Sequence, residues 1–227
     1  MLFANTIISI LSQIIPFASG LFVFRFLSGE MKVLLVYFGL GLFVEVISSY
    51  LGLNNIHNLW LFHFFTIIEY GLLMWVFSAW LKSQTLKRIL RISIPLLSLV
   101  GIIAMFFLEG IHQFNAYSRS VASLILVAAS AFILFELSME SFNSVLRQPR
   151  FWIASAALLY FAGSLVLFAL SNVLLVLLKW DIERVRTVFA VYTIINMITN
   201  LIYAGGFLCQ VQAQRSGGPS LLEPSPS

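Results

Sequence analysis

Long runs of apolar residues, separated by short polar segments, follow one another along almost the whole chain. Seven runs have a length of about 20 residues, which an α-helix needs to cross the hydrocarbon core of a bilayer. We therefore predict seven transmembrane helices, at residues 2–26, 33–53, 59–81, 89–108, 120–137, 151–178 and 187–209. The connections between these runs are too short to form a separate soluble domain.

The pattern changes after Cys209, where Ser, Pro, Gly and Gln replace the apolar residues. A segment of this composition cannot bury enough apolar surface to fold on its own. We predict a transmembrane bundle at residues 1–209 and a disordered tail at residues 210–227. No Lys or Arg precedes the first apolar run, so we interpret that run as a retained helix and not as a cleaved signal peptide.

The composition supports a membrane location. Hydrophobic residues make up 60% of the 227 residues and charged residues only 10%, against about 25% charged residues in typical soluble domains. A soluble fold of this size could not remove so much apolar surface from water. We therefore predict an all-α integral protein of the cell membrane, in contact with lipids. The net charge of +4 is spread over short loops, which does not favour a nucleic-acid partner.

Positively charged residues indicate the orientation, because cytoplasmic loops of membrane proteins are enriched in Lys and Arg. With the N-terminus outside, nine of the 13 Lys and Arg residues lie inside and four lie outside. We therefore predict an external N-terminus and an internal C-terminus. The inner group is Arg25, Lys32, Lys82, Lys87, Arg88, Arg91, Arg147, Arg150 and Arg215, and the outer group is Arg119, Lys179, Arg184 and Arg186.

The third apolar run carries two titratable residues inside a stretch that matches the thickness of a membrane. Trp60 and Trp80 bracket this stretch, about 30 Å apart in a helix, and Trp prefers the two membrane interfaces. His63 and Glu69 lie between them. Ionisable groups at this depth are costly and usually have a function. His63, Thr66 and Tyr70 share one helical stripe, with Glu69 at its edge.

Glu45 on the preceding helix is expected at a depth between His63 and Glu69. The two glutamates would then lie on neighbouring antiparallel helices, where two carboxyl groups could share one proton. We predict that Glu45 and Glu69 form a coupled pair.

The last apolar run carries a second polar stripe, and Asn196 in it is expected at the depth of Glu69. We predict that this stripe faces the polar residues of the third helix or a common cavity. The alternative is that these groups only hold helices together, at about 0.6 kcal/mol per hydrogen bond. The stripe consists of Tyr192, Asn196, Thr199, Asn200 and Tyr203.

The sixth run is bracketed by Trp152 and Trp180, which are about 42 Å apart in a helix and so too far apart for an upright span. Either this helix is tilted or it breaks near Asn172, where a polar residue could line a cavity.

A repeat is a further hypothesis from residue spacing. Glu45 and Glu69 are 24 residues apart, as are Asn172 and Asn196. Helices two and six would run outward and helices three and seven inward, which permits a parallel 3+1+3 repeat with helix four as the linker. Ile-rich helices match one another easily, and helix one does not align with helix five at this offset.

The candidate site contains polar residues from the second, third, sixth and seventh helices, and we predict that it binds a small molecule or a proton. The first hypothesis is a small-molecule or proton-coupled transporter. The second is a sensor that binds an apolar ligand and acts through a partner protein at the basic inner loops. The third is a lipid-modifying enzyme with a Glu–His acid–base pair. The site residues are Glu45, His63, Thr66, Glu69, Tyr70, Asn172, Tyr192, Asn196 and Asn200.

We assign no catalytic residue and predict no cofactor. The three histidines show no spacing typical of a zinc site, so we predict no metal. The single cysteine, Cys209, excludes an internal disulfide.

Overall fold

The computed structural model describes the backbone of residues 2–113, 115–172 and 182–215, with side chains over most of these ranges. All the regular elements in this part of the chain are helical. The elements are α1 (Leu2–Phe22), the 3-10 turn η1 (Phe24–Phe26), α2 (Gly29–Leu53), α3 (Leu59–Trp80), α4 (Gln84–Ala104), the π-helical turn η2 (Met105–Glu109), α5 (Ala116–Ser138), α6 (Phe142–Val145), α7 (Pro149–Asn172) and α8 (Ile182–Arg215).

Six helices in the described ranges are long and apolar enough to cross a membrane, and α1 adds a shorter apolar segment at Ile7–Phe22. Each predicted apolar run overlaps one long helix, which confirms an all-α, multi-pass fold of membrane type. Most boundaries differ from the prediction by a few residues, and two of these differences matter for the site and the tail. α5 begins at Ala116, before the expected residue 120, and α8 continues past Cys209 to Arg215. Residues 216–227 of the predicted disordered tail lie outside the described residues.

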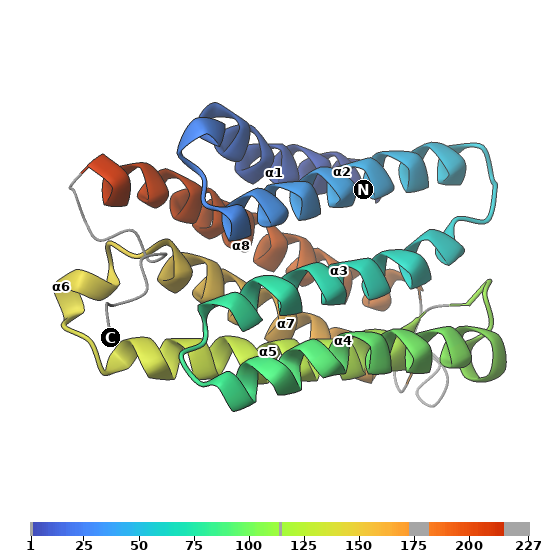
Figure 1. Ribbon diagram of the computed structural model, residues 1–227. Helices are drawn as coiled ribbons and strands as arrows, with labels where there is room; N and C mark the ends of the chain where they lie inside the picture. Colours follow the sequence, from blue (N-terminus) through green and yellow to red (C-terminus); the bar gives the residue numbers. More distant parts are fainter. Residues whose placement is uncertain (1, 114, 173–181, 216–227) are drawn as a thin grey trace.

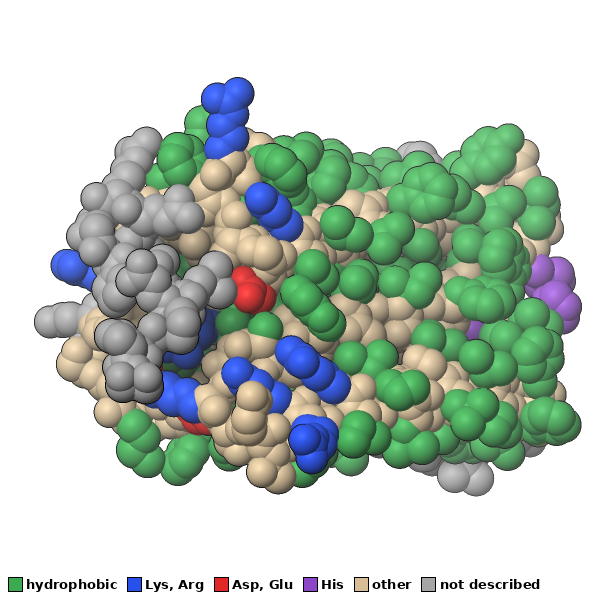
Figure 2. Space-filling model, viewed as in Figure 1, with side chains coloured by type: hydrophobic (Ala, Val, Ile, Leu, Met, Phe, Trp, Pro, Cys, Tyr) green, Lys and Arg blue, Asp and Glu red, His purple; other side chains and the backbone are tan. Residues whose placement is uncertain are grey.

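The outer surface of the bundle is apolar. Large hydrophobic side chains point outward over much of the length, among them Phe107, which is 81% exposed, and Leu159, which is 42% exposed. Figure 2 shows these side chains over the middle of the molecule, with Lys and Arg gathered at one end and His at the other. Water does not tolerate so extended an apolar surface, whereas lipid does.

The helices form a ring (Figure 1). α1 packs on α2, α2 on α3, α3 on α5, α5 on α7, α7 on α8, and α8 on α1. α4 stands outside this ring and packs against α3 and α5. This arrangement gives two distinct interiors, which are the centre of the six-helix ring and the space between α3, α4 and α5.

Small residues set the distance between α7 and α8. A Cβ atom added at Gly206 of α8 would lie 2.5 Å from Cδ1 and 3.1 Å from Cγ1 of Ile153. Ile153 is fully buried, so it cannot swing away. In lipid, helices associate through such close packing because no hydrophobic force drives them together.

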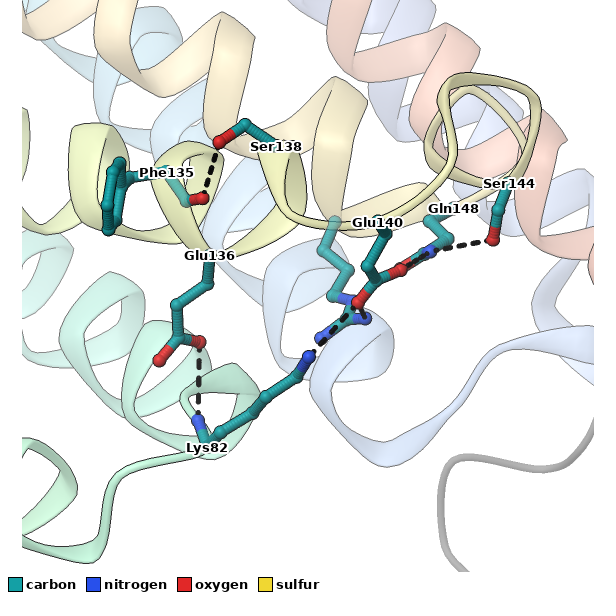
Figure 3. A network of polar contacts seen from close by, with 8 residues as sticks. Lys82, Phe135, Glu136, Ser138, Glu140, Ser144 and Gln148 are labelled. Carbon is teal, nitrogen blue, oxygen red and sulfur yellow. Dashed lines mark hydrogen bonds and ion pairs between the residues drawn. The ribbon is translucent and has the colours of Figure 1, made fainter.

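The basic end of the bundle is held by a polar cluster around Glu140 (Figure 3). Glu140 Oε1 pairs with Lys82 Nζ at 3.2 Å and with Arg150 Nη2 at 3.3 Å. Glu136 accepts a hydrogen bond from the backbone N–H of Lys82 at 3.3 Å. Burial alone would raise the pKa of Glu140, but hydrogen bonds from Gln148 and Lys82 and the charges of Arg150 and Lys82 hold it below its usual range.

Substituting Gly206 with Ala should destabilise the protein by about 1–3 kcal/mol, because the added methyl group overpacks a full interface. Gly205→Ala is the matched control, since its Cβ would lie 3.7 Å from Trp152, an ordinary contact. Thermal unfolding of both variants in lipid measures the difference. Equal midpoints for the two variants would contradict the packing described here.

Because the pKa of Glu140 is lowered in the folded protein, the stability of the protein should depend on pH. A carboxyl group whose folded pKa is depressed stabilises the protein above its unfolded pKa, and this contribution disappears as the pH falls through the folded pKa. The unfolding midpoint of the parent should therefore fall more steeply under acid conditions than that of Glu140→Gln. Thermal unfolding across a pH series tests this, and parallel curves would be the contrary result.

Candidate functional site

A buried ion pair lies inside the ring of helices. Glu69 of α3 is 1% exposed and Arg119 of α5 is 6% exposed, and Arg119 Nη1 donates to Glu69 Oε2. The hydroxyl group of Tyr37, from α2, donates to the second carboxylate oxygen at 3.0 Å. The carboxylate therefore receives a hydrogen bond on each oxygen, from a different neighbouring helix each time.

The network continues on the side of the cation. Arg119 Nη2 donates to the hydroxyl oxygen of Tyr160 in α7 at 3.0 Å, and Tyr192 of α8 donates to the same oxygen at 2.7 Å. The guanidinium carbon also lies 5.7 Å from the ring centroids of Tyr160 and Phe161, within the range of cation–π attraction. Five side chains thus join α2, α3, α5, α7 and α8, which are five of the six ring helices.

The position of Arg119 depends on where α5 begins. Asn115, the residue before this helix, donates to the side chain of Thr66 at 2.7 Å and to the backbone oxygen of Phe62 at 3.0 Å. The start of α5 therefore lies beside the first turns of α3, at Phe62 and Thr66. From this level the side chain of Arg119 reaches Glu69.

Glu109 holds the same turn from the other side. Its Oε1 accepts the backbone N–H groups of Tyr117 at 2.6 Å and Ser118 at 2.9 Å, and an anion at a helix N-terminus is stabilised by both the unpaired amides and the helix dipole. His63 Nδ1 lies 3.7 Å from Glu109 Oε2, and His63 Nε2 lies 3.1 Å from the backbone oxygen of Gln113. His63 and Thr66 therefore hold the segment that positions Arg119.

A polar cavity of about 30 Å³ is lined by two residues that hydrogen-bond to the ion pair. Tyr37 and Tyr160 of the network line it, together with Gln13 of α1 and Asn196 and Tyr203 of α8. Among the described residues, Gln13 Oε1 and the Tyr203 hydroxyl are buried atoms with no hydrogen-bond partner. The cavity is large enough for one or two water molecules or a small cation, but not for an organic substrate.

The polar stripe of α8 faces α1 as well as this cavity. Asn196 donates to Ser9 at 3.0 Å and Asn200 donates to Ser12 at 2.9 Å. Both asparagines line the cavity, as do Tyr37 and Tyr160 of the network. The stripe therefore both holds α8 against α1 and forms part of the cavity wall. These two roles were alternatives in the prediction from the sequence.

The other predicted site residues are dispersed. Glu45 of α2 faces Ser9 and Gln13 of α1, and the residue that α2 brings to Glu69 is Tyr37. The hydroxyl group of Tyr70 lies 2.7 Å from Ser93 Oγ of α4, outside the ring. Asn172 ends α7, and its side chain and Trp180 lie outside the described residues, as does the stretch that would show a tilt or break.

Three members of the network, Arg119, Tyr37 and Tyr160, were absent from the predicted site. Arg119 was expected in an external loop, and this expectation is corrected: the residue lies in the first turn of α5 and is buried. The sequence does contain a sign of this role. Arg119 directly precedes the apolar run at residues 120–137, which contains no Lys or Arg. Tyr37 precedes Glu45 by two helical turns in α2. Tyr160 lies in α7 after Trp152, which was predicted to lie at a membrane interface.

No family model, curated protein or solved structure matches this chain. The argument for function therefore rests on the site itself. Within the described ranges, no three His, Cys, Asp or Glu side chains are grouped so that they could hold a metal ion.

The ion pair makes Arg119→Gln a destabilising change of about 3–5 kcal/mol, because Glu69 would remain buried without its cation. Glu69→Gln should be destabilising for the reciprocal reason. The double variant Glu69→Gln/Arg119→Gln should be more stable than either single variant, since it leaves no buried charge. Unfolding of all four proteins in lipid gives the coupling free energy, and additive effects would show that the pair contributes nothing.

Proposed function

We propose that this protein is a membrane receptor module that binds an apolar ligand between α3, α4 and α5. The observation that supports this proposal is a pocket of about 130 Å³ between these helices, with an almost entirely apolar lining. Leu97, Gly101 and Ala104 of α4 form one wall, and Ile67 of α3 and Val121 of α5 face them. An apolar pocket with few polar groups is typical of sites for apolar molecules.

The walls of the pocket include sequence neighbours of both members of the ion pair. Thr66 and Tyr70, which flank Glu69 in α3, line it, and so does Ser118, the neighbour of Arg119 in α5. A molecule that enters between α3 and α5 therefore acts on the two helices that hold the opposite charges. A ligand that prefers one spacing of these helices shifts the balance between two arrangements of the network, which is how binding becomes a signal.

The basic end of the bundle is the proposed contact surface for a partner protein. Lys and Arg gather at this end, where α1 meets α2 and α3 meets α4 (Figures 1 and 2). We propose from the positive-inside rule that this end faces the cytoplasm. The protein would then be a seven-helix protein of the cell membrane, with its N-terminus outside and its C-terminus inside. The parallel 3+1+3 repeat stays a hypothesis from residue spacing.

A proton-coupled carrier is the second candidate. The polar cavity beside Glu69 and Arg119 supports it, because a carboxyl group beside a small polar space can exchange a proton. The cavity volume favours a proton over an organic solute. A Glu–His enzyme has less support, because His63 lies beside Glu109 and not beside Glu45 or Glu69. Both carboxylate oxygens of this Glu109 already accept hydrogen bonds from Tyr117 and Ser118 at the start of α5.

A photoactivatable long-chain diazirine alcohol, added to the full chain in lipid vesicles, should label the walls of the apolar pocket. Val121→Phe should reduce labelling, because Val121 lines the pocket and is 46% exposed, so that a larger ring fills space without disturbing a core. Val166→Phe on α7 is the matched control, at 57% exposure and away from the pocket. Peptide mapping by mass spectrometry measures the labelling.

Equal labelling of the two variants would contradict the receptor proposal. Proton uptake into vesicles that contain the protein would favour the carrier, and it should then disappear in Glu69→Gln/Arg119→Gln.

A further inference from the structure

The polar cavity inside the ring contains groups that protein atoms do not satisfy. Tyr203 is 2% exposed and its hydroxyl group has no hydrogen-bond partner among the described residues, and the same holds for Gln13 Oε1. Buried polar atoms are nearly always paired, with protein or with ordered water. A water molecule needs about 10–15 Å³ and two to four polar partners. The cavity, at about 30 Å³, meets both requirements.

The cavity also lies between the two glutamates. On one side it is lined by Tyr37, whose hydroxyl group donates to Glu69. On the other side it is lined by Gln13, and the carboxyl group of Glu45 faces Gln13 and Ser9. Glu45 Oε2 is a third buried atom without a partner. Unpaired atoms therefore occur on Glu45, on Gln13 beside it and on Tyr203 in the cavity wall. Tyr37 of the same wall donates to Glu69.

We infer that this cavity holds water that connects Glu45 to Glu69 and allows a proton to pass between them. The inference goes beyond ligand binding at the apolar pocket and does not depend on it. In the transfer, the O–H bond of protonated Glu45 breaks and an O–H bond forms on Glu69. Each water and Tyr37 accept one proton and release one, so they end unchanged. Gln13 orients the water and takes no proton.

The charged and titratable surroundings of the two carboxyl groups differ. Glu69 is faced by Tyr37 of α2, Arg119 of α5, Tyr160 of α7 and Tyr203 of α8. Glu45 is faced by Ser9 and Gln13 of α1, neither of which titrates. A proton that arrives at Glu69 neutralises the partner of Arg119, so the path reaches the network that joins the helices.

Gly41 gives a way to close this path. It lines the cavity, and a Cβ atom added there would lie 3.8 Å from Gln13 Oε1 and 3.3 Å from Phe65 Cζ. Gly41→Ala therefore places a methyl group where the water would lie. Gly71→Ala is the matched control in a neighbouring helix, because its Cβ would meet only Ile94 of α4, at 3.6 Å.

The test is an infrared pH titration of the Glu69 carboxyl band in the full chain in lipid. The band is assigned by its loss in Glu69→Gln/Arg119→Gln. Glu45→Gln should shift the titration midpoint of this band, since connected carboxyl groups titrate as a pair. The shift should persist in the Gly71→Ala background and disappear in the Gly41→Ala background. No shift in the parent, or an equal shift with Gly41→Ala, would overturn the inference.

Radiolytic hydroxyl labelling of the unmodified protein gives a second test that does not depend on any variant folding. Ordered water beside a buried side chain produces labelling that exposure alone would not. Tyr203 should be modified several-fold faster than Tyr70, a tyrosine that is buried to a similar degree but lines the apolar pocket. Equal rates would mean that the cavity is dry and would overturn the inference.

Discussion

The arrangement of the helices depends on one electrostatic requirement, which is that a buried carboxylate and a buried guanidinium must meet. Neither Glu69 nor Arg119 can stay charged in an apolar interior alone, because the loss of hydration costs several kcal/mol per ion. Together they cancel most of this cost, but only when α3 and α5 hold a fixed depth and rotation. The hydrogen bonds from Tyr37 and to Tyr160 extend this requirement to α2 and α7. The ion pair therefore specifies which helices are neighbours, even where packing alone would permit alternatives.

Apolar length and composition were sufficient to predict the helices, and they predicted little of how the helices associate. A run of about 20 apolar residues must be helical in lipid, because each backbone polar group needs a partner within its own segment. Depth along a helix was also informative, since it singled out Glu69 as a residue that needs a polar partner. The partner was not predictable in the same way, because Glu45, Arg119 and Asn196 all lie at accessible depths. The rotation of each helix about its own axis determines which of these side chains points toward Glu69, and the sequence does not specify that rotation.

Arg119 shows why counting charges by loop has a limit. The rule assigns a cation beside an apolar run to the adjacent loop. Here α5 begins beside α3, because Asn115 donates to Thr66. Glu109 accepts a backbone N–H from the first turn of α5 and holds that turn in place. Because α5 begins beside α3, its first turn brings Arg119 within reach of Glu69. The sequence contains Asn115 and Arg119, but their contacts with α3 span 49 and 50 residues and are not local.

That separation has a consequence for the order in which the protein is made. Arg119 follows Glu69 by 50 residues, so the ribosome completes α3 before the residue that neutralises it exists. During this interval Glu69 has no cation to pair with, and a carboxyl group in apolar surroundings is less costly in its neutral form. α4 emerges between the two partners and stays outside the ring, where it packs against both α3 and α5. The chain thus makes the peripheral helix α4 before it makes the partner of Glu69, so the order of synthesis differs from the order of the helices around the ring.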